Sequence, residues 1–314
     1  TLLYNQRLHR PETALHVLHL FNESLLEILT RCADADTAAT TPTDFTYSSL
    51  SLDEFQAILN EVGVLADDIE DIMPLTPMQE GMLYHSLAEE GTNAYFSQWL
   101  FEISGDLNLD TFSESWTDVA KRHQVLRTAF AADCSERPVQ VILKQRSVDF
   151  EYHDIRDRSE AEQKQRIDSF CAEDRSRRRD LAKDVLMQVT VFRLDNQTHT
   201  VILSYPHILI DGWSQTVVVE DLLAIYEARV LDRTVNLTRV VSQREYLEWL
   251  EGRDWEGSRN YWSRYLEGYE SLVEVPRAVE SGPEKSFSPE RYEFLLEDDL
   301  TSQLSELTVK HGAT

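Results

Sequence analysis

One short stretch of the sequence combines residue types that could act together on a proton. His207 ends an apolar run, Asp211 follows four residues later, and Gly212 comes directly after it. A neutral imidazole can accept a proton or hydrogen-bond a reacting group, and a nearby carboxylate can orient the ring. By spacing alone, the residues fit equally well a core histidine satisfied by a turn aspartate. Glycine is scarce in this chain, with 10 in 314 residues, so the added Gly212 makes the pattern more specific.

Motifs for other common chemistries are absent from the sequence. It contains no HExxH or CxxC metal-binding pattern, no GxGxxG or GxxxxGK[ST] nucleotide-binding pattern, and no GxSxG nucleophile elbow. The three cysteines, Cys32, Cys134 and Cys171, have no metal-type spacing and fit reduced thiols. We therefore expect no metal site and no directly bound cofactor.

The strong negative charge narrows the classes of partner. The chain carries 30 Lys and Arg against 56 Asp and Glu, a formal net charge of −26. Such a chain repels phosphate backbones and anionic lipid, so neither nucleic acid nor a membrane surface is expected as a partner. No apolar run approaches the ~20 residues of a membrane span, and the N-terminus lacks a signal-peptide pattern. We expect a cytoplasmic protein, and the absent initiating Met predicts a fragment of a longer chain.

The candidate residues lie between a predicted strand and a predicted helix. Residues 200–208 are strand-like, and Ser214 is predicted to cap a helix that continues to Val230. Strands and helices alternate along the chain without a regular βαβ repeat, which predicts an α+β or mixed α/β fold. Other predicted helices are 11–32, 159–182, 242–250 and 256–267, other predicted strands are 95–103, 139–143 and 186–194, and residues 109–130 are predicted as an amphipathic helix running into an apolar segment.

Three ordered blocks resemble the motifs of condensation domains in non-ribosomal peptide synthetases. Residues 207–214 (HILIDGWS) resemble the HHxxxDG motif with its frequent Trp-Ser extension. Residues 75–85 (LTPMQEGMLYH) resemble the first block of that family, and residues 122–130 (RHQVLRTAF) resemble its RHxxLRTxF block. The three blocks stand in the order and spacing of the family, and the resemblance extends from about residue 70 to the end.

The resemblance implies an enzyme that joins two aminoacyl units, each held as a thioester on the phosphopantetheine of a carrier domain. Family members have two lobes of the chloramphenicol acetyltransferase type. Residues 69–240 then correspond to the first lobe, and residues 241–314 to connecting helices and a truncated start of the second. The implied partners are the upstream and downstream peptidyl carrier domains, with adjacent epimerization and adenylation domains of the same synthetase. The fragment alone is expected to be inactive.

Carried over by residue, the resemblance makes His207 the catalytic residue. The residues expected to support it are Asp211, Gly212, Trp213, Ser214 and Arg127. Arg127 is expected to pair with Asp211, since the family pairs this arginine with the motif aspartate and the two groups match as a bidentate fork. Pro206 departs from the pattern, because the family has its first histidine there. Residues expected to be structural are Arg122, His123, Leu126, His85, His153 and His199.

The N-terminal residues carry a separate resemblance. Residues 1–32 resemble the C-terminal tail of an epimerization or condensation-type domain, and residues 33–68 read as a linker with a short helix. If so, the following domain accepts a donor that ends in a D-residue. Two alternatives remain at this point. One is a catalytically silent, condensation-like docking module, and the other is a stand-alone coenzyme A-dependent acyltransferase of the same HxxxD superfamily.

Overall fold

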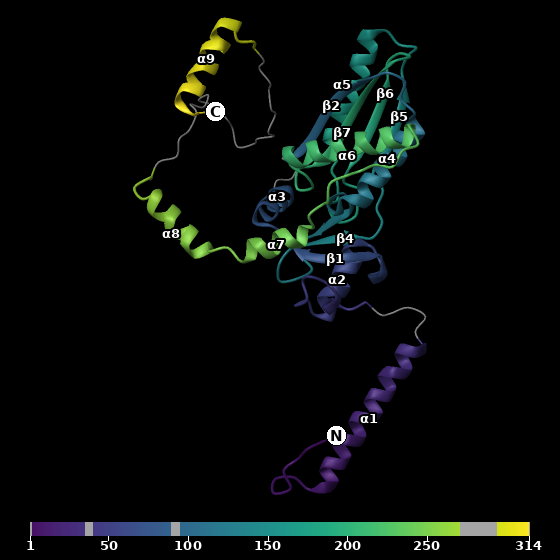
Figure 1. Ribbon diagram of the computed structural model, residues 1–314, viewed down its shortest axis with the longest axis vertical. Coiled ribbons are helices and arrows are strands. Elements are labelled where there is room, and N and C mark those ends of the chain that lie inside the picture. The colour runs from purple at the N-terminus through teal and green to yellow at the C-terminus, as the bar shows by residue number, and fades with distance from the viewer. Residues whose placement is uncertain (1, 35–39, 89–94, 271–293, 314) are drawn as a thin grey trace.

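A computed structural model describes residues 2–34, 40–88, 95–270 and 294–313 (Figure 1). Two sheets form its centre. The larger has the strand order β2-β7-β6-β5, with β2 at Phe96–Ser104, β7 at Thr198–Pro206, β6 at Gln188–Arg193 and β5 at Asp149–Asp154. The smaller has the order β1-β4-β3, with β1 at Ile69–Pro74, β4 at Val139–Leu143 and β3 at Thr128–Ala131. All pairings are antiparallel except that of β5 with β6.

Helices cover the larger sheet on both faces. The helices are α1 (Pro11–Asp34), α2 (Leu52–Val62), α3 (Pro77–Ala88), α4 (Leu109–Arg122), α5 (Glu160–Ser176), α6 (Gly212–Val230), α7 (Gln243–Glu251), α8 (Trp255–Tyr265) and α9 (Asp298–His311). Apolar residues of α4 and α6 pack with alternate residues of β6 and β7, such as Val191 and Leu203. Phe170 of α5 packs on the opposite face, against Phe192 and Ile202. Seven successive residues of β7, from His199 to Tyr205, are buried, so both faces of this strand are covered.

The smaller sheet has a core of its own with α2. Ser51 and Glu54 form a capping box at the start of this helix, and Phe55, Ile58 and Leu59 face the sheet. In contrast, α1, α8 and α9 lie outside the two-sheet body in Figure 1, and apart from Ala14 the described side chains of these helices are not buried. The helices α3, α4 and α6 instead contribute side chains to the main core around β7.

The α+β expectation is confirmed, with several changes in detail. Residues 109–130 form a helix, a short 3-10 turn (Gln124–Arg127) and then β3. The helix predicted at 159–182 stops at Ser176, and α6 is capped by Asp211 rather than Ser214. The strand β5 was not predicted, because its sequence DFEYHD is largely polar, as suits the edge of a sheet. The sequence at 276–289, rich in Pro, Gly and Ser, predicts a bend, but these residues lie outside the described part of the chain.

Candidate active site

The turn that carries His207 is held from three sides. Its backbone N–H donates to the carbonyl of Tyr95, just before β2, at 2.6 Å. The side-chain amide of Gln79 in α3 donates to the carbonyl of Ile208 at 3.4 Å. The apolar residues that follow, Ile208 to Ile210, are buried in the main core. The turn is therefore anchored by its backbone and its apolar side chains, which leaves the His207 ring half-buried at the end of β7.

The two nitrogens of the His207 ring differ in their surroundings. Nδ1 is buried and has no hydrogen-bond partner among the residues that the structure describes. A ligand that approaches the ring can therefore reach only Nε2. In a neutral imidazole one nitrogen carries the proton, and the partner of the other nitrogen normally decides which. Here nothing in the described residues accepts a proton from Nδ1.

Asp211 acts on this turn through α6. Its Oδ1 accepts the backbone N–H of Ser214 at 2.8 Å, which caps the helix. This hydrogen bond holds the pKa of Asp211 below its ordinary value. The carboxylate is therefore ionised at neutral pH and adds a negative charge near the imidazole. That geometry fits an orienting and capping residue.

The expected pair between Arg127 and Asp211 is wrong. Arg127 is buried on the other side of the fold, where its Nη1 donates to Glu70 at 2.7 Å and to the Leu143 carbonyl, and its Nε to the Ala120 carbonyl at 2.9 Å. The cause is topological, because the 3-10 turn leads Arg127 toward the edge of the smaller sheet, where β1 supplies an acid. Arg127 is therefore no part of the His207 site.

The remaining motif residues form the first turn of α6. Trp213 is 86% exposed, so its indole lies on the surface beside the turn. A Cβ added to Gly212 would meet no atom within 4 Å, so the protein's own packing leaves room for a larger residue there. Ser214 contributes its backbone N–H to the cap formed by Asp211. The structure thus places Gly212, Trp213 and Ser214 next to His207, and only Arg127 of the predicted set elsewhere.

Two side chains that the motifs did not single out support the site. Tyr205, buried in β7, donates its hydroxyl proton to Gln215 of α6 at 2.7 Å, which joins the strand to the first turns of the helix. Burial, and secondarily the charge of Asp211, raises the pKa of Tyr205 to about 12, so it remains a neutral donor. Gln79 is the other. Its capping box with Thr76 follows from their spacing of three residues, but its reach to Ile208 is visible only in the structure.

Two other histidines are packed inside the fold, and a third lies near the residue that anchors the His207 turn. His153 stacks on Phe192 with ring centroids 4.8 Å apart, and His199 is buried in β7, so both have packed, structural positions. The ring of His85 lies 5.9 Å from that of Tyr95, the residue whose carbonyl binds the His207 backbone. No group of three or more potential metal ligands occurs within the described residues.

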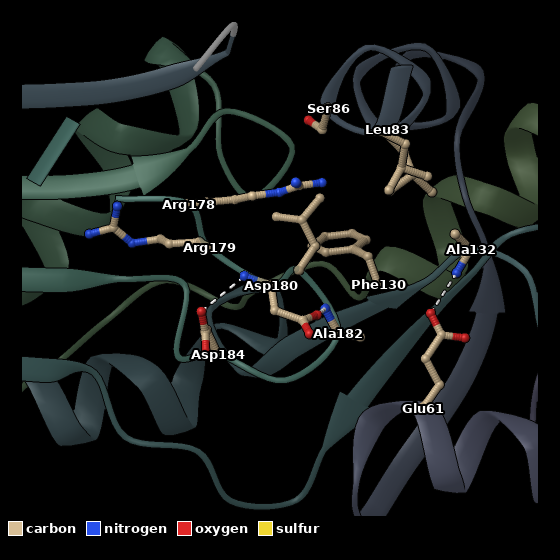
Figure 2. Close-up of a pocket in the computed structure, with 12 residues that line it drawn as sticks. Glu61, Leu83, Ser86, Phe130, Ala132, Arg178, Arg179, Asp180, Ala182 and Asp184 are labelled. Atoms are coloured by element: carbon tan, nitrogen blue, oxygen red, sulfur yellow. Dashed lines mark hydrogen bonds between the residues drawn. The ribbon is translucent and has the colours of Figure 1, made fainter. Parts of the chain in front are cut away.

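A pocket of about 470 Å³ lies apart from His207, between α3, β3 and residues 178–184 (Figure 2). Leu83 and Phe130 supply part of its apolar wall. In Figure 2 the Arg178 side chain extends toward Ser86, whereas Arg179 points away from it. His207 does not line this pocket. The pocket therefore adds nothing to the reaction site.

Comparison with known proteins identifies relatives for nearly the whole chain. The model of the family described as "Condensation domain" matches residues 69–314. Bacitracin synthase 3 of Bacillus licheniformis is 32% identical over 311 residues, which is 99% of this chain and 5% of that protein. Tyrocidine synthase 2 of Brevibacillus parabrevis is 36% identical over 248 residues, which is 79% of this chain and 7% of that protein. The chain thus spans a small part of these relatives.

Solved structures show the same fold at lower identity. The first condensation domain of the calcium-dependent antibiotic synthetase, bound to a substrate analogue, superposes with a TM-score of 0.64 at 19% identity, covering 77% of this chain and 58% of that one. The X-domain in its complex with OxyB from teicoplanin biosynthesis gives a TM-score of 0.55 at 24% identity, covering 65% of this chain and 46% of that one. The mixed α/β architecture is therefore that of solved condensation domains.

Proposed function

Since this chain belongs to the condensation domain family, we propose that it takes part in forming an amide bond between two carrier-bound substrates. The donor is an aminoacyl or peptidyl thioester, and the acceptor is the free amine of an aminoacyl thioester. Both are held on the phosphopantetheine arms of carrier domains. The observation that carries the proposal is the anchored turn between β7 and α6, which presents one face of the His207 imidazole.

The reaction needs no covalent enzyme intermediate. The acceptor nitrogen attacks the thioester carbon, the carbon–sulfur bond breaks, and the proton lost by nitrogen balances the one gained by the leaving thiolate. Because a thioester is already activated, most of the rate enhancement comes from holding both reactants in line, worth up to ~7–11 kcal/mol for well-oriented groups. The side chain at the meeting point has to orient the amine or stabilise the oxyanion.

The surroundings of His207 favour a hydrogen-bonding role over that of a base. A base at Nε2 requires the proton on Nδ1, which is buried without an acceptor among the described residues. A buried, unpaired N–H costs about 1–3 kcal/mol. A buried N–H without a partner is disfavoured, which supports the tautomer that carries its proton on Nε2 and points this N–H at the substrate.

Two substitutions in the full-length synthetase test the function and the role together. His207→Ala removes both functions of the ring, and we expect it to abolish amide formation while leaving the circular dichroism spectrum unchanged. His207→Gln keeps an N–H donor at a similar reach but has no basic nitrogen. It should therefore retain part of the activity if the ring donates a hydrogen bond. Product formation by His207→Ala near the parental rate would contradict the assignment of His207.

The donor is proposed to end in a D-residue. The proposal rests on the resemblance of residues 1–32 to the tail of an epimerization domain, and α1 occupies most of that range. Residues 33–68 would then link that domain to the condensation lobe at 69–240, and residues 241–314 would begin the second lobe. The test compares D- and L-terminated donors on the intact synthetase by mass spectrometry of the product. Equal rates would contradict the stereochemical part and leave amide formation unaffected.

The partner domains and the cellular compartment are proposed from the same family. Carrier domains upstream and downstream, with adjacent epimerization and adenylation domains, are the proposed partners, and the cytoplasm is the proposed compartment. No helix in the described residues is long and apolar enough to cross a membrane. No resident cofactor is proposed, because the phosphopantetheine arrives with each substrate.

A second candidate is a silent module that docks carriers or another enzyme. It is favoured by Pro206, which replaces the first motif histidine at the last residue of β7. The fold of this chain also resembles the X-domain whose structure was solved in complex with OxyB. The parental protein separates the two candidates, because a silent module would bind carriers but form no amide in the assay that detects product from an active control domain.

A further inference from the structure

A buried carboxylate in the middle of α6 holds two basic side chains from the end of α4. Oδ2 of Asp221 accepts a hydrogen bond from Nε of Arg122 at 2.7 Å and lies 2.8 Å from Nε2 of His123. Asp221 and His123 are both buried. Arg122 also donates through Nη2 to the carbonyl of Thr238, beyond the end of α6. One carboxylate therefore joins α4, α6 and the segment that leads to α7.

The charge state of this cluster follows from its burial. Burial lowers the pKa of His123, and the hydrogen bond to Asp221 offsets this only in part. His123 is therefore neutral at neutral pH and donates its Nε2 proton to the carboxylate. Arg122 supplies the balancing positive charge. A buried carboxylate with one charged and one neutral donor is well satisfied, and such charge-assisted bonds are stronger and more directional than neutral ones.

The position of this cluster relative to the His207 turn gives it a further role. The helix α6 begins at Gly212, and Asp221 lies about 15 Å along its axis from Asp211, because each helical residue adds about 1.5 Å. Two other contacts between α4 and α6 lie farther from the turn. Tyr226 accepts the backbone N–H of Asn108 at 2.9 Å, and the exposed Arg229 pairs with Asp118 and Glu114. Of these contacts, the one at Asp221 is buried and nearest the turn.

We infer that Asp221 is a positioning residue for His207. It locks α6 along α4, and α6 in turn carries Asp211 and the end of the turn that presents the imidazole. The turn is then fixed at one end by β7 in the sheet and at the other by this lock. This inference rests on the proposed function, and it assigns to Arg122 and His123 a role beyond the packing expected of them from sequence.

The test compares Asp221→Asn with a neighbouring charge-matched control. Glu220→Gln removes the same charge one residue away, on the exposed side of α6. Arg229→Gln is the second control, because it breaks an exposed ion pair between the same two helices. Amide formation is measured in the full-length synthetase at saturating carrier-bound substrates. The imidazole signals of His207 are followed by NMR in the 314-residue chain and assigned with His207→Gln.

We expect Asp221→Asn to lower kcat by about ten- to a hundredfold, because misplacing a reacting group by about 1 Å costs up to about a hundredfold. The His207 signals should shift in Asp221→Asn and stay in place in both controls. A merely stabilising role would leave those signals and kcat unchanged once the sample is folded.

The outcomes separate this inference from the proposed function. If Asp221→Asn behaves like Glu220→Gln in both kcat and His207 signals, the positioning role is wrong. If the parental synthetase forms no amide, the proposed function fails, while the NMR comparison still decides whether Asp221 fixes the turn. Should Asp221→Asn not fold, Asp221→Glu keeps the charge on a longer side chain, and the same shift of the His207 signals is expected from it. Parental signals in that variant would overturn the inference.

Discussion

Replacing Arg127 by Met tests whether this arginine acts at the smaller sheet or at the His207 turn. The two methylene-rich side chains are similar in volume, so Met retains much of the packing of the arginine stem. The guanidinium donates to the carbonyls of Ala120 and Leu143 and to the carboxylate of Glu70. The Arg127 side chain is only 5% exposed, so water has little access to the acceptors that lose their donor in the variant.

The expected cost follows from those contacts. Ala120 lies in the last turn of α4, where carbonyls lack partners within the helix. Two buried carbonyls left unpaired cost about 1–3 kcal/mol each, whereas the Glu70 carboxylate is 35% exposed and can be solvated again. We expect Arg127→Met to lower the free energy of unfolding by about 3–5 kcal/mol. Glu70→Gln keeps an oxygen acceptor for the guanidinium, and Arg127 keeps its bonds to the two carbonyls, so Glu70→Gln should cost less than Arg127→Met.

Urea unfolding with linear extrapolation measures these values, and double-mutant cycles locate the partner. A cycle of Arg127→Met with Glu70→Gln should show a coupling energy of about 0.5 kcal/mol or more. A cycle of Arg127→Met with Asp211→Asn should show additivity within about 0.5 kcal/mol. The reasoning is refuted if Arg127 couples to Asp211, or if Arg127→Met costs no more than Glu70→Gln.

Two further predictions concern other contacts of the fold. Asp211→Ala should lower the free energy of unfolding by about 0.5–2 kcal/mol through loss of the cap. Because the pKa of Asp211 is lowered in the folded state, this difference is complete above the ordinary carboxyl pKa and closes as the pH falls through the lowered value, so parallel unfolding at pH 7 and in acid checks it. Burial, and secondarily a hydrogen bond to Glu61, raises the pKa of Cys134 to about 12. Alkylation of Cys134 by iodoacetamide at pH 8 should therefore be slow and should become faster in Glu61→Gln, as followed by peptide mass spectrometry, and an unchanged rate would contradict the role of Glu61.

Local sequence was sufficient for the strand–turn–helix that carries His207. The apolar residues at 200–208 predict a strand, and the Asp-Gly-Trp-Ser segment predicts the start of a helix. The identity of the cap was the error, because Asp211 and Ser214 both suit a helix start and the choice depends on which residue leaves the helical conformation. The strand β5 was missed because an edge strand needs no apolar pattern.

The sequence by itself determined that His207, Asp211, Gly212, Trp213 and Ser214 meet at the turn, since these neighbours in the chain are also neighbours in space. Only the tertiary structure decided the long-range pairs, such as Arg127 with Glu70 and Arg122 with Asp221. The partners lie 57 and 99 residues apart, and the chain offers 56 acids as candidates. Periodicity records which face of a helix is apolar but not which carboxylate lies opposite a given arginine. That choice is made by how β1 lies near the 3-10 turn that carries Arg127 and how α6 packs beside α4.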